Sequence, residues 1–316
     1  MSQANNSAAA EIAVPSRKIG FIVMTIIIVF VAYWMNLQGS TTISSEIRST
    51  DAEELEGFSS EAWHLPDDDL LGFVEIPTGE FTMGSNPALD RLAYENERWS
   101  TVLRQGTVSL PSFYINRFET TKAQFQQFVD DNGLYVAPDI LEGDQTEPVS
   151  NITWSEAVAY TQWLDSKLRD SGLTPEPLRK LLENGGGVVL PTEAEWEKAA
   201  RSSDGRIFPW GAQPTSGFAN FNARAKRSVG ASACAACANG LSDMAGNVWE
   251  MTRSPLQDYP YDPDDDAVNL AEDALWVMRG GSYTDDINNI RTAVRGAVDP
   301  GVRNDTIGFR VAISPR

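Results

Sequence analysis

The chain has 316 residues, a formal net charge of −19 and a single histidine, His64. This acidic balance argues against nucleic acid as a partner, because phosphate binding needs clustered Lys and Arg. One imidazole cannot build a His-based zinc or iron site, and a Ser-His-Asp triad needs that imidazole well placed. His64 lies in EAWHLPDDD, an acidic, proline-bounded stretch where we expect it to be exposed.

Residues 19–37, IGFIVMTIIIVFVAYWMNL, form an uncharged apolar run. As a helix rising about 1.5 Å per residue, the run matches the thickness of a bilayer core. It lacks a small-residue cleavage site after it, so we predict an uncleaved transmembrane helix rather than a cleaved signal peptide. Arg17 and Lys18 precede the run, and the positive-inside rule therefore predicts a cytoplasmic tail at residues 1–18. In a bacterium this is a single-pass inner-membrane protein with its C-terminal part in the periplasm.

Residues 38–70 are polar and acidic, and we predict a solvated linker there. Residues 71–316 are long enough for one irregular α+β domain. Its opening, FVEIPTGEFTMGS at 73–85, alternates like two strands around a turn.

Two helices are expected next. Thr121 is a plausible N-cap for a helix that Gly133 closes, with Phe125 and Phe128 on its apolar face. PVSNITWSEAVAYTQWLDSKL at 148–168 repeats the pattern, with Thr153 or Ser155 as the cap; its expected apolar face is Ala157, Tyr160, Trp163 and Leu164.

LPTEAEWEKAARSS at 190–203 is the clearest helix start, because Thr192 at the N-cap and Glu195 at N3 form a capping box. We expect its glutamates to favour the helix dipole rather than to act as a catalytic carboxylate pair. After residue 204 turns and short strands dominate, and the acidic run at 258–273 is interpreted as a solvated insertion.

Cys234 and Cys237 form CAAC in a small-residue loop. A local structural disulfide is the favoured interpretation, because it suits an oxidising compartment. A thioredoxin-like redox pair would need a strand before the motif and a helix starting at the first cysteine. A zinc site would need more ligands than this loop supplies.

Five stretches in order resemble the formylglycine-generating enzyme, or sulfatase-modifying factor, family. They are IPTGEFTMGS (76–85), INRFETTKAQFQQFV (115–129), LPTEAEWEKAAR (190–201), NGLSDMAGNVWEMT (239–252) and RGGSY…R…R…IGFRVA (279–312). The resemblance covers residues 71–316 and implies a C-type lectin-like fold with little regular secondary structure.

Enzymes of that family oxidise a cysteine of a client sulfatase, using oxygen and a copper ion held by two cysteines. By resemblance, these cysteines fall on Asp285 and near Ile290. A carboxylate and an isoleucine cannot replace two soft sulfurs for Cu(I), so formylglycine-generating activity and copper are not expected. The ergothioneine-pathway relatives use a His-rich iron site, which a chain with only His64 lacks.

The resemblance also implies a structural calcium ion. Its ligands would be the carboxylates of Asp243 and Glu250 and the carbonyls of Gly246 and Val248, oxygen donors that suit calcium. The alternative is that these are ordinary turn and cap residues. A second family calcium site would begin at Asn220 and Phe221, but the loop that should complete it is replaced by AKRSVGASACAAC.

The family's substrate groove would be lined here by Trp249, Ser282, Tyr283 and the residues that follow. Asp285 and Asp286 lie in that stretch. Arg291 and Arg295 could clamp a carboxylate or phosphate, or they could tie loops together internally; we favour the internal role for at least one of them.

The leading functional hypothesis is a non-catalytic, membrane-anchored accessory or binding subunit of an envelope protein complex. The first alternative is an enzyme with altered oxidative chemistry, with Tyr283, Asp285, Asp286 and Arg295 as candidates. The second is a displayed, lectin-like ligand-binding protein, because SYTDDINNI partly resembles the variable segments of retroelement-diversified relatives.

Overall fold

The computed structural model of the chain describes residues 54–215, 217–267 and 274–315. Within these ranges no helix is both long and apolar enough to cross a bilayer. The predicted cytoplasmic tail and the predicted transmembrane helix at 19–37 lie outside the described residues.

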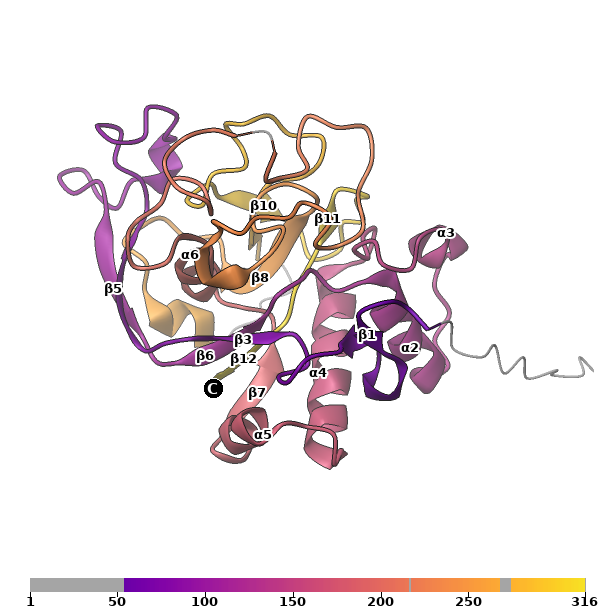
Figure 1. Cartoon of the computed structure of the whole chain (residues 1–316). Helices are drawn as coiled ribbons and strands as arrows, with labels where there is room; N and C mark the ends of the chain where they lie inside the picture. The colour runs from indigo at the N-terminus through magenta and orange to yellow at the C-terminus, as the bar shows by residue number, and fades with distance from the viewer. Residues whose placement is uncertain (1–53, 216, 268–273, 316) are drawn as a thin grey trace, which may run out of the picture. The chain divides into compact units, whose positions relative to one another are not determined.

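Two four-stranded sheets organise the domain, with a smaller ribbon and a hairpin beside them (Figure 1). The first sheet is fully antiparallel and has the order β3 (Phe73–Ile76), β6 (Phe113–Asn116), β12 (Ala312–Pro315) and β7 (Gly186–Val189). The C-terminal strand thus lies between segments from the first and middle parts of the chain.

The second sheet carries the residues of the predicted groove. Its order is β10 (Gly296–Val298), β9 (Trp276–Arg279), β8 (Trp249–Pro255) and β11 (Ile307–Gly308). β8 runs antiparallel to β9 and parallel to β11. Trp249 begins β8, and Ser282 follows the end of β9, so neighbouring strands bring these two segments together.

The predicted helix starts at Thr121, Thr153 and Thr192 are confirmed. The helices are α2 (Lys122–Asn132), α3 (Pro138–Leu141), α4 (Trp154–Asp170), α5 (Glu176–Glu183) and α6 (Glu193–Arg201). The three threonines are the N-caps of α2, α4 and α6, each in a complete capping box. Gly133 ends α2 with φ 59°, a left-handed conformation that glycine adopts at low cost.

The helices face two apolar cores. α2 and α4 bury Phe125, Phe128, Tyr160 and Leu164 in the larger core. Trp196 on α6 is fully buried in the second core, which α6 shares with the ribbon of β4 (Gly79–Met83) and β5 (Gly106–Leu110). The expected strands at 73–85 exist, but β3 pairs with β6 and β4 with β5, so the two do not form a hairpin with each other.

The compact unit begins at Glu54 rather than at Leu71. Residues 58–66, expected to be linker, form a hairpin of β1 (Phe58–Ser59) and β2 (Leu65–Pro66), and Leu65 is buried in the larger core. The expectation that His64 is exposed is wrong, because its side chain is only 8% exposed. The many acidic residues around this hairpin predicted a solvated linker, although the apolar residues between them pack into the core.

Candidate functional site

The turn after β9 builds the centre of the predicted groove. Gly281 has φ 73°, and a Cβ there would lie 2.6 Å from the carbonyl oxygen of Asn289. Only glycine fits such a close approach in the left-handed region. This turn carries Ser282, Tyr283 and Asp285 past the start of β8, where Trp249 lies.

Asp285, the residue predicted to fall on the first copper-cysteine position, is held by four hydrogen bonds. Its Oδ2 accepts from the Ser282 N–H (2.9 Å), the Ser282 hydroxyl (2.6 Å) and Trp249 Nε1 (2.9 Å). Its Oδ1 accepts from Asn289 Nδ2 (2.8 Å). Trp249, Ser282 and Asp285 therefore do come together as predicted, but the carboxylate organises the turn itself.

Ile290, the residue predicted to fall near the second copper-cysteine position, faces the interior. Its side chain is 0% exposed and packs in a small apolar cluster with Phe208, Ala219 and Ala245. It offers no donor atom for a metal. Copper binding would need two thiolates. Asp285 instead offers a carboxylate whose two oxygens already accept hydrogen bonds, and Ile290 offers a buried alkyl group.

A second polar cluster is centred on Asp305, whose neighbour Thr306 accepts from the Trp249 N–H (2.8 Å). The Tyr283 hydroxyl donates to Asp305 Oδ2 (3.0 Å), and Lys226 Nζ donates to Asp305 Oδ1 (2.7 Å) and to the Ser150 hydroxyl. Burial tends to raise the pKa of Asp305, but the hydrogen bond and charge of Lys226 hold this pKa below its usual value. Burial and the contact with Asp305 raise the pKa of Tyr283. Sequence reasoning missed Lys226 and Asp305, since neither belongs to a recognisable motif.

Asp286 is not part of either cluster. It is exposed, and its Oδ1 accepts from the Asn288 N–H (2.8 Å) in a local turn. Asp286 is therefore next to Asp285 in the sequence, but the two side chains do not share contacts in the predicted groove wall.

Arg291 is an internal ion-pair residue. Its guanidinium is 0% exposed and donates to Glu97 (2.6 and 2.9 Å) and to Asp90 Oδ2 (2.6 Å). It also lies 5.2 Å from the ring centroid of Tyr94. A ligand carboxylate or phosphate would have to displace two protein carboxylates, so the structure favours the internal role, the second of the two predicted alternatives, for Arg291.

Arg295 is likewise engaged internally. It makes a two-pronged ion pair with Glu193, at 2.6 and 2.9 Å, and stacks 4.1 Å from the ring centroid of Tyr259. Glu193 also accepts from Arg279 (3.0 Å), so the first turn of α6 is neutralised by buried arginines as well as by the helix dipole.

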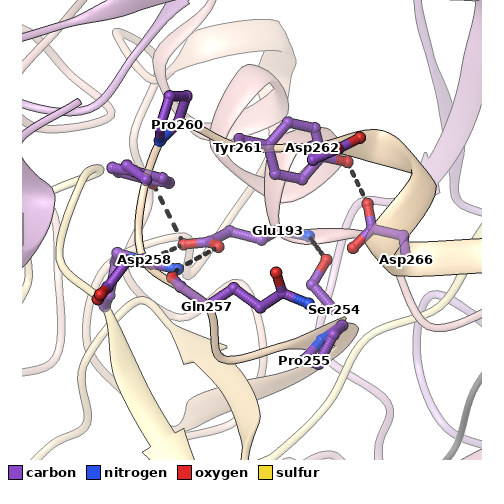
Figure 2. Close-up of a pocket in the computed structure, with 11 residues that line it drawn as sticks. Glu193, Ser254, Pro255, Gln257, Asp258, Pro260, Tyr261, Asp262 and Asp266 are labelled. Atoms are coloured by element: carbon purple, nitrogen blue, oxygen red, sulfur yellow. Dashed lines mark hydrogen bonds and ion pairs between the residues drawn. The ribbon is translucent and has the colours of Figure 1, made fainter. Parts of the chain in front are cut away.

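A small cavity lies beside this ion pair, lined by Glu193, Tyr259, Tyr261, Asp266 and Arg295 among others. Figure 2 shows Glu193 at the centre of the lining residues, with Tyr261 and Asp266 next to each other on one side, where the Tyr261 hydroxyl donates to Asp266. The cavity measures about 10 Å³ for a water-sized sphere, which is room for about one water molecule. It is too small to admit a substrate.

The expected calcium ligands lie in a buried, negatively charged part of the domain. Asp243 is 6% exposed, and Glu250 and a third carboxylate, Glu119, are each 0% exposed. Arg310 pairs with Glu250 at 2.6 Å to both oxygens. Burial raises the pKa of Asp243 to about 6, and burial together with Asp243 and Glu250 raises that of Glu119 well above its usual value. Sequence reasoning gave no signal for Glu119.

Asn220 adds an unsatisfied oxygen to this region. Its backbone bridges to Gly246, and its Nδ2 donates to Asn247 Oδ1 (3.0 Å). Its buried Oδ1 has no hydrogen-bond partner. Among the described residues no group of three or more acidic, His or Cys side chains is arranged as a metal site. An orphaned amide oxygen on a residue that Asn247 links to the buried carboxylate of Glu119 nevertheless fits the oxygen-only donor set that calcium takes.

The two cysteines form a local disulfide. Cys234 and Cys237 are bonded to each other, and the Cys237 N–H donates to the Cys234 carbonyl (3.1 Å). The loop is fastened to the domain by Arg206, which donates to the Ala236 carbonyl (2.7 Å). This agrees with the favoured interpretation of the CAAC motif.

Comparison with known proteins finds enzymes among the relatives. Hercynine oxygenase of Mycolicibacterium smegmatis is 32% identical over 59% of this chain and 46% of its own length. The hercynine oxygenase of Mycolicibacterium thermoresistibile is 30% identical over 73% of this chain and 56% of its own. Formylglycine-generating enzyme of Streptomyces coelicolor is 27% identical over 76% and 88%. The chain therefore spans about half the length of the hercynine oxygenases it matches.

Solved structures agree on the fold. PvdO from Pseudomonas aeruginosa has a TM-score of 0.61 at 22% identity and covers 77% of this chain and 94% of its own. Treponema denticola variable protein 1 has a TM-score of 0.57 at 24% identity, with 77% and 95% covered. The model of the family described as the sulfatase-modifying factor enzyme 1-like domain matches residues 61–315. The chain belongs to this family, with its α+β fold.

Proposed function

We propose that the chain is a membrane-anchored, non-catalytic member of the family that serves as an accessory or binding subunit of an envelope protein complex. One observation carries the proposal. The two positions where a copper-dependent relative needs thiolates hold Asp285 and Ile290, and both side chains are engaged within the protein.

The remaining donors do not replace those thiolates. The chain has only two cysteines, and they are bonded to each other in a different loop. It has one histidine, His64, which is buried beside β2, so a multi-histidine iron site has no ligands. The chain therefore lacks the paired copper thiolates and the histidine-rich iron site that the family resemblance implies for its oxidative enzymes.

Anchoring rests on the apolar run at 19–37 and on Arg17 and Lys18 before it. Such a helix would hold the domain at the membrane on the periplasmic side. Copurification tests the accessory role: the tagged chain is extracted from its native membranes in mild detergent and its partners are quantified. Recovery of a stoichiometric membrane or envelope protein is expected, and recovery of the chain alone would count against the proposal.

Calcium belongs to this proposal as a structural ion. Of the four predicted ligands, Asp243 would supply a side-chain oxygen and Gly246 and Val248 backbone carbonyls, whereas both oxygens of Glu250 are paired with Arg310. Asn220, predicted to begin a second site, adds an unsatisfied side-chain oxygen. Bound calcium would neutralise part of the buried charge and so stabilise the fold. We expect added calcium to raise the melting temperature, and Asp243→Asn to abolish the increase while Asp262→Asn, at an exposed position, keeps it. An equal response of both variants to calcium and to magnesium would contradict a specific site.

An enzyme with altered chemistry is the second candidate. The relatives that are named as oxygenases favour it, together with the cluster of Tyr283, Lys226 and Asp305 beside Trp249. Its test is oxygen consumption by the purified chain after loading with copper or iron and addition of thiol peptides. Turnover that Tyr283→Phe abolishes would favour this candidate over the accessory role.

A further inference from the structure

The loop between β4 and β5, residues 84–105, exposes an unusual amount of apolar surface. In Figure 1 the β4–β5 ribbon runs to the left edge of the domain, where this loop forms two lobes. Leu89 is 72% exposed and Val102 is 85% exposed. The exposed large apolar side chains of the loop are Leu89, Leu92, Tyr94, Val102 and Leu103. Apolar residues gathered on a protruding loop mark interaction sites rather than random surface.

The base of the β4–β5 loop is fixed rather than loose. Arg291 binds Asp90 and Glu97 inside the loop, and Tyr94 donates to Asn289 Oδ1 (3.0 Å). Gln105 donates to the Gly84 carbonyl (3.0 Å) and closes the two ends. The loop therefore presents its apolar residues in one arrangement, which lowers the entropic cost of docking.

One of the two lobes, which contains residues 100–103, ends in a tight turn whose apolar residues are exposed. The Ser100 N–H donates to the Leu103 carbonyl (2.8 Å), and the Ser100 hydroxyl accepts from the N–H groups of Val102 and Leu103. Turn positions are normally taken by Gly, Asn, Asp or Ser. Val102 and Leu103 instead place two aliphatic side chains at the extremity of the loop.

The exposed charges of the loop have the opposite sign to the chain as a whole. Arg91 and Arg104 are exposed and Arg98 is half-buried, against one exposed carboxylate, Glu95. The other two acids of the loop, Asp90 and Glu97, are neutralised by Arg291. A chain of net charge −19 thus carries a basic, aliphatic surface here.

We propose that the β4–β5 loop docks on the surface of an anionic phospholipid bilayer. Leu89, Leu92, Val102 and Leu103 would enter the boundary between headgroups and acyl chains, with the arginines at the lipid phosphates. The proposal rests on the proposed anchor at 19–37, which keeps the bilayer at high effective concentration. A symmetric contact between two copies would instead bring like-charged arginines together.

The test uses the full chain in nanodiscs. Thr101→Cys places one reactive thiol beside Val102, because the native cysteines are bonded to each other. A fluorophore on this thiol is quenched by nitroxide-labelled lipid if the lobe reaches the bilayer. Strong quenching is expected in phosphatidylcholine–phosphatidylglycerol discs and weak quenching in phosphatidylcholine discs, whereas a label introduced by Lys180→Cys on α5 should be unquenched in both.

Matched variants separate charge from general damage. Arg91→Gln with Arg104→Gln should lower the docking constant about thirtyfold, because each arginine near an anionic surface contributes about 1 kcal/mol and about 1.4 kcal/mol corresponds to a tenfold change in binding. Arg224→Gln, an exposed arginine outside the loop, should leave quenching unchanged. Val102→Ser with Leu103→Ser should reduce quenching while the melting temperature stays constant.

Other results would overturn the proposal. If the label is not quenched in folded protein embedded in discs, the loop does not contact the bilayer, and its apolar surface would instead bind a protein partner. A fluorescence change that grows with protein concentration in lipid-free detergent would indicate contact between copies. Failure to enter discs would instead refute the proposed anchor, and adding preformed anionic vesicles to the same labelled protein would still test the loop.

Discussion

Arg291 balances two buried carboxylates at once, Asp90 and Glu97. Burial disfavours a charged guanidinium, but the hydrogen bonds and charges of Glu97 and Asp90 raise the pKa of Arg291 above its usual value. The group therefore stays charged, and its partners depend on it. Losing one member of such a cluster leaves uncompensated charge in the interior, which costs far more than the pair itself contributes.

Arg291→Leu should lower the free energy of unfolding by about 3–5 kcal/mol, because Asp90 and Glu97 would remain buried without a counter-charge. Urea denaturation of residues 54–316, which form one compact unit, measures the loss. Arg98→Leu is the control: its pair with Glu95 is exposed, so the change should be no more than about 1 kcal/mol. Equal losses in the two variants would show that Arg291 is not a buried ion-pair residue.

His64 allows a direct test of burial, since it is the only histidine. Burial lowers its pKa from the usual value, and its buried Nδ1 has no hydrogen-bond partner. Its folded-state pKa lies below the unfolded one, so the unfolded chain binds the proton first as the pH falls. Stability should therefore decline below about pH 6.5.

The imidazole NMR signal of His64 should titrate below pH 6.5, and His64→Gln should flatten the pH dependence of unfolding between about pH 7 and 5. A titration midpoint at or above the free-histidine value would contradict the buried position of His64 in the hairpin of β1 and β2.

Helix starts illustrate what the sequence can predict at the scale of single elements. The capping boxes at Thr121, Thr153 and Thr192 are formed by residues three positions apart, so a local pattern contains all the information needed. The ion pairs that fix the predicted groove wall join residues far apart in the sequence: Arg291 lies 194 positions from Glu97, and Arg295 lies 102 from Glu193. No local pattern distinguishes such an arginine from one that binds a ligand.

Glu156 at the start of α4 permits a test of one capping box. Burial tends to raise its pKa, but the ion pair with Arg303 and the hydrogen bond from the Thr153 N–H lower it below the usual value. The stabilisation is therefore present above the unfolded pKa and is lost as the pH falls through the lower folded pKa. Glu156→Gln should cost no more than about 1 kcal/mol at pH 7, because it removes the partly exposed ion pair with Arg303 while glutamine can still accept from the Thr153 N–H.

The stability difference between wild type and Glu156→Gln should shrink as the pH falls below about 4.5. Chemical denaturation at pH 7 and pH 3 measures it, with Glu176→Gln as the control, because Glu176 is exposed on α5. A difference that is the same at both pH values would show that the carboxylate charge of Glu156 does not support the cap.

At the scale of the whole molecule, the domain keeps the family fold, while Asp285 and Ile290, the residues predicted to fall on the thiolate positions, are engaged in contacts within the protein. The family and its α+β fold could be predicted because five ordered motifs span the domain. The site residues could be predicted only in part. Trp249, Ser282 and Asp285 are in contact with one another as predicted. Ile290, Arg291 and Arg295 are buried in contacts elsewhere in the domain. Which side chains meet depends on the turn at Gly281 and on the pairing of β8 with β9, and neither can be derived from residue spacing.

Copper binding tests the central claim most directly. The purified chain is titrated with Cu(I) against a chromogenic chelator and then incubated in air with a cysteine-containing peptide, which mass spectrometry examines for an aldehyde. With Asp285 and Ile290 in place of two thiolates, the chelator should keep the copper and the peptide should stay unmodified. Tight, stoichiometric copper binding together with an aldehyde on the peptide would contradict the account.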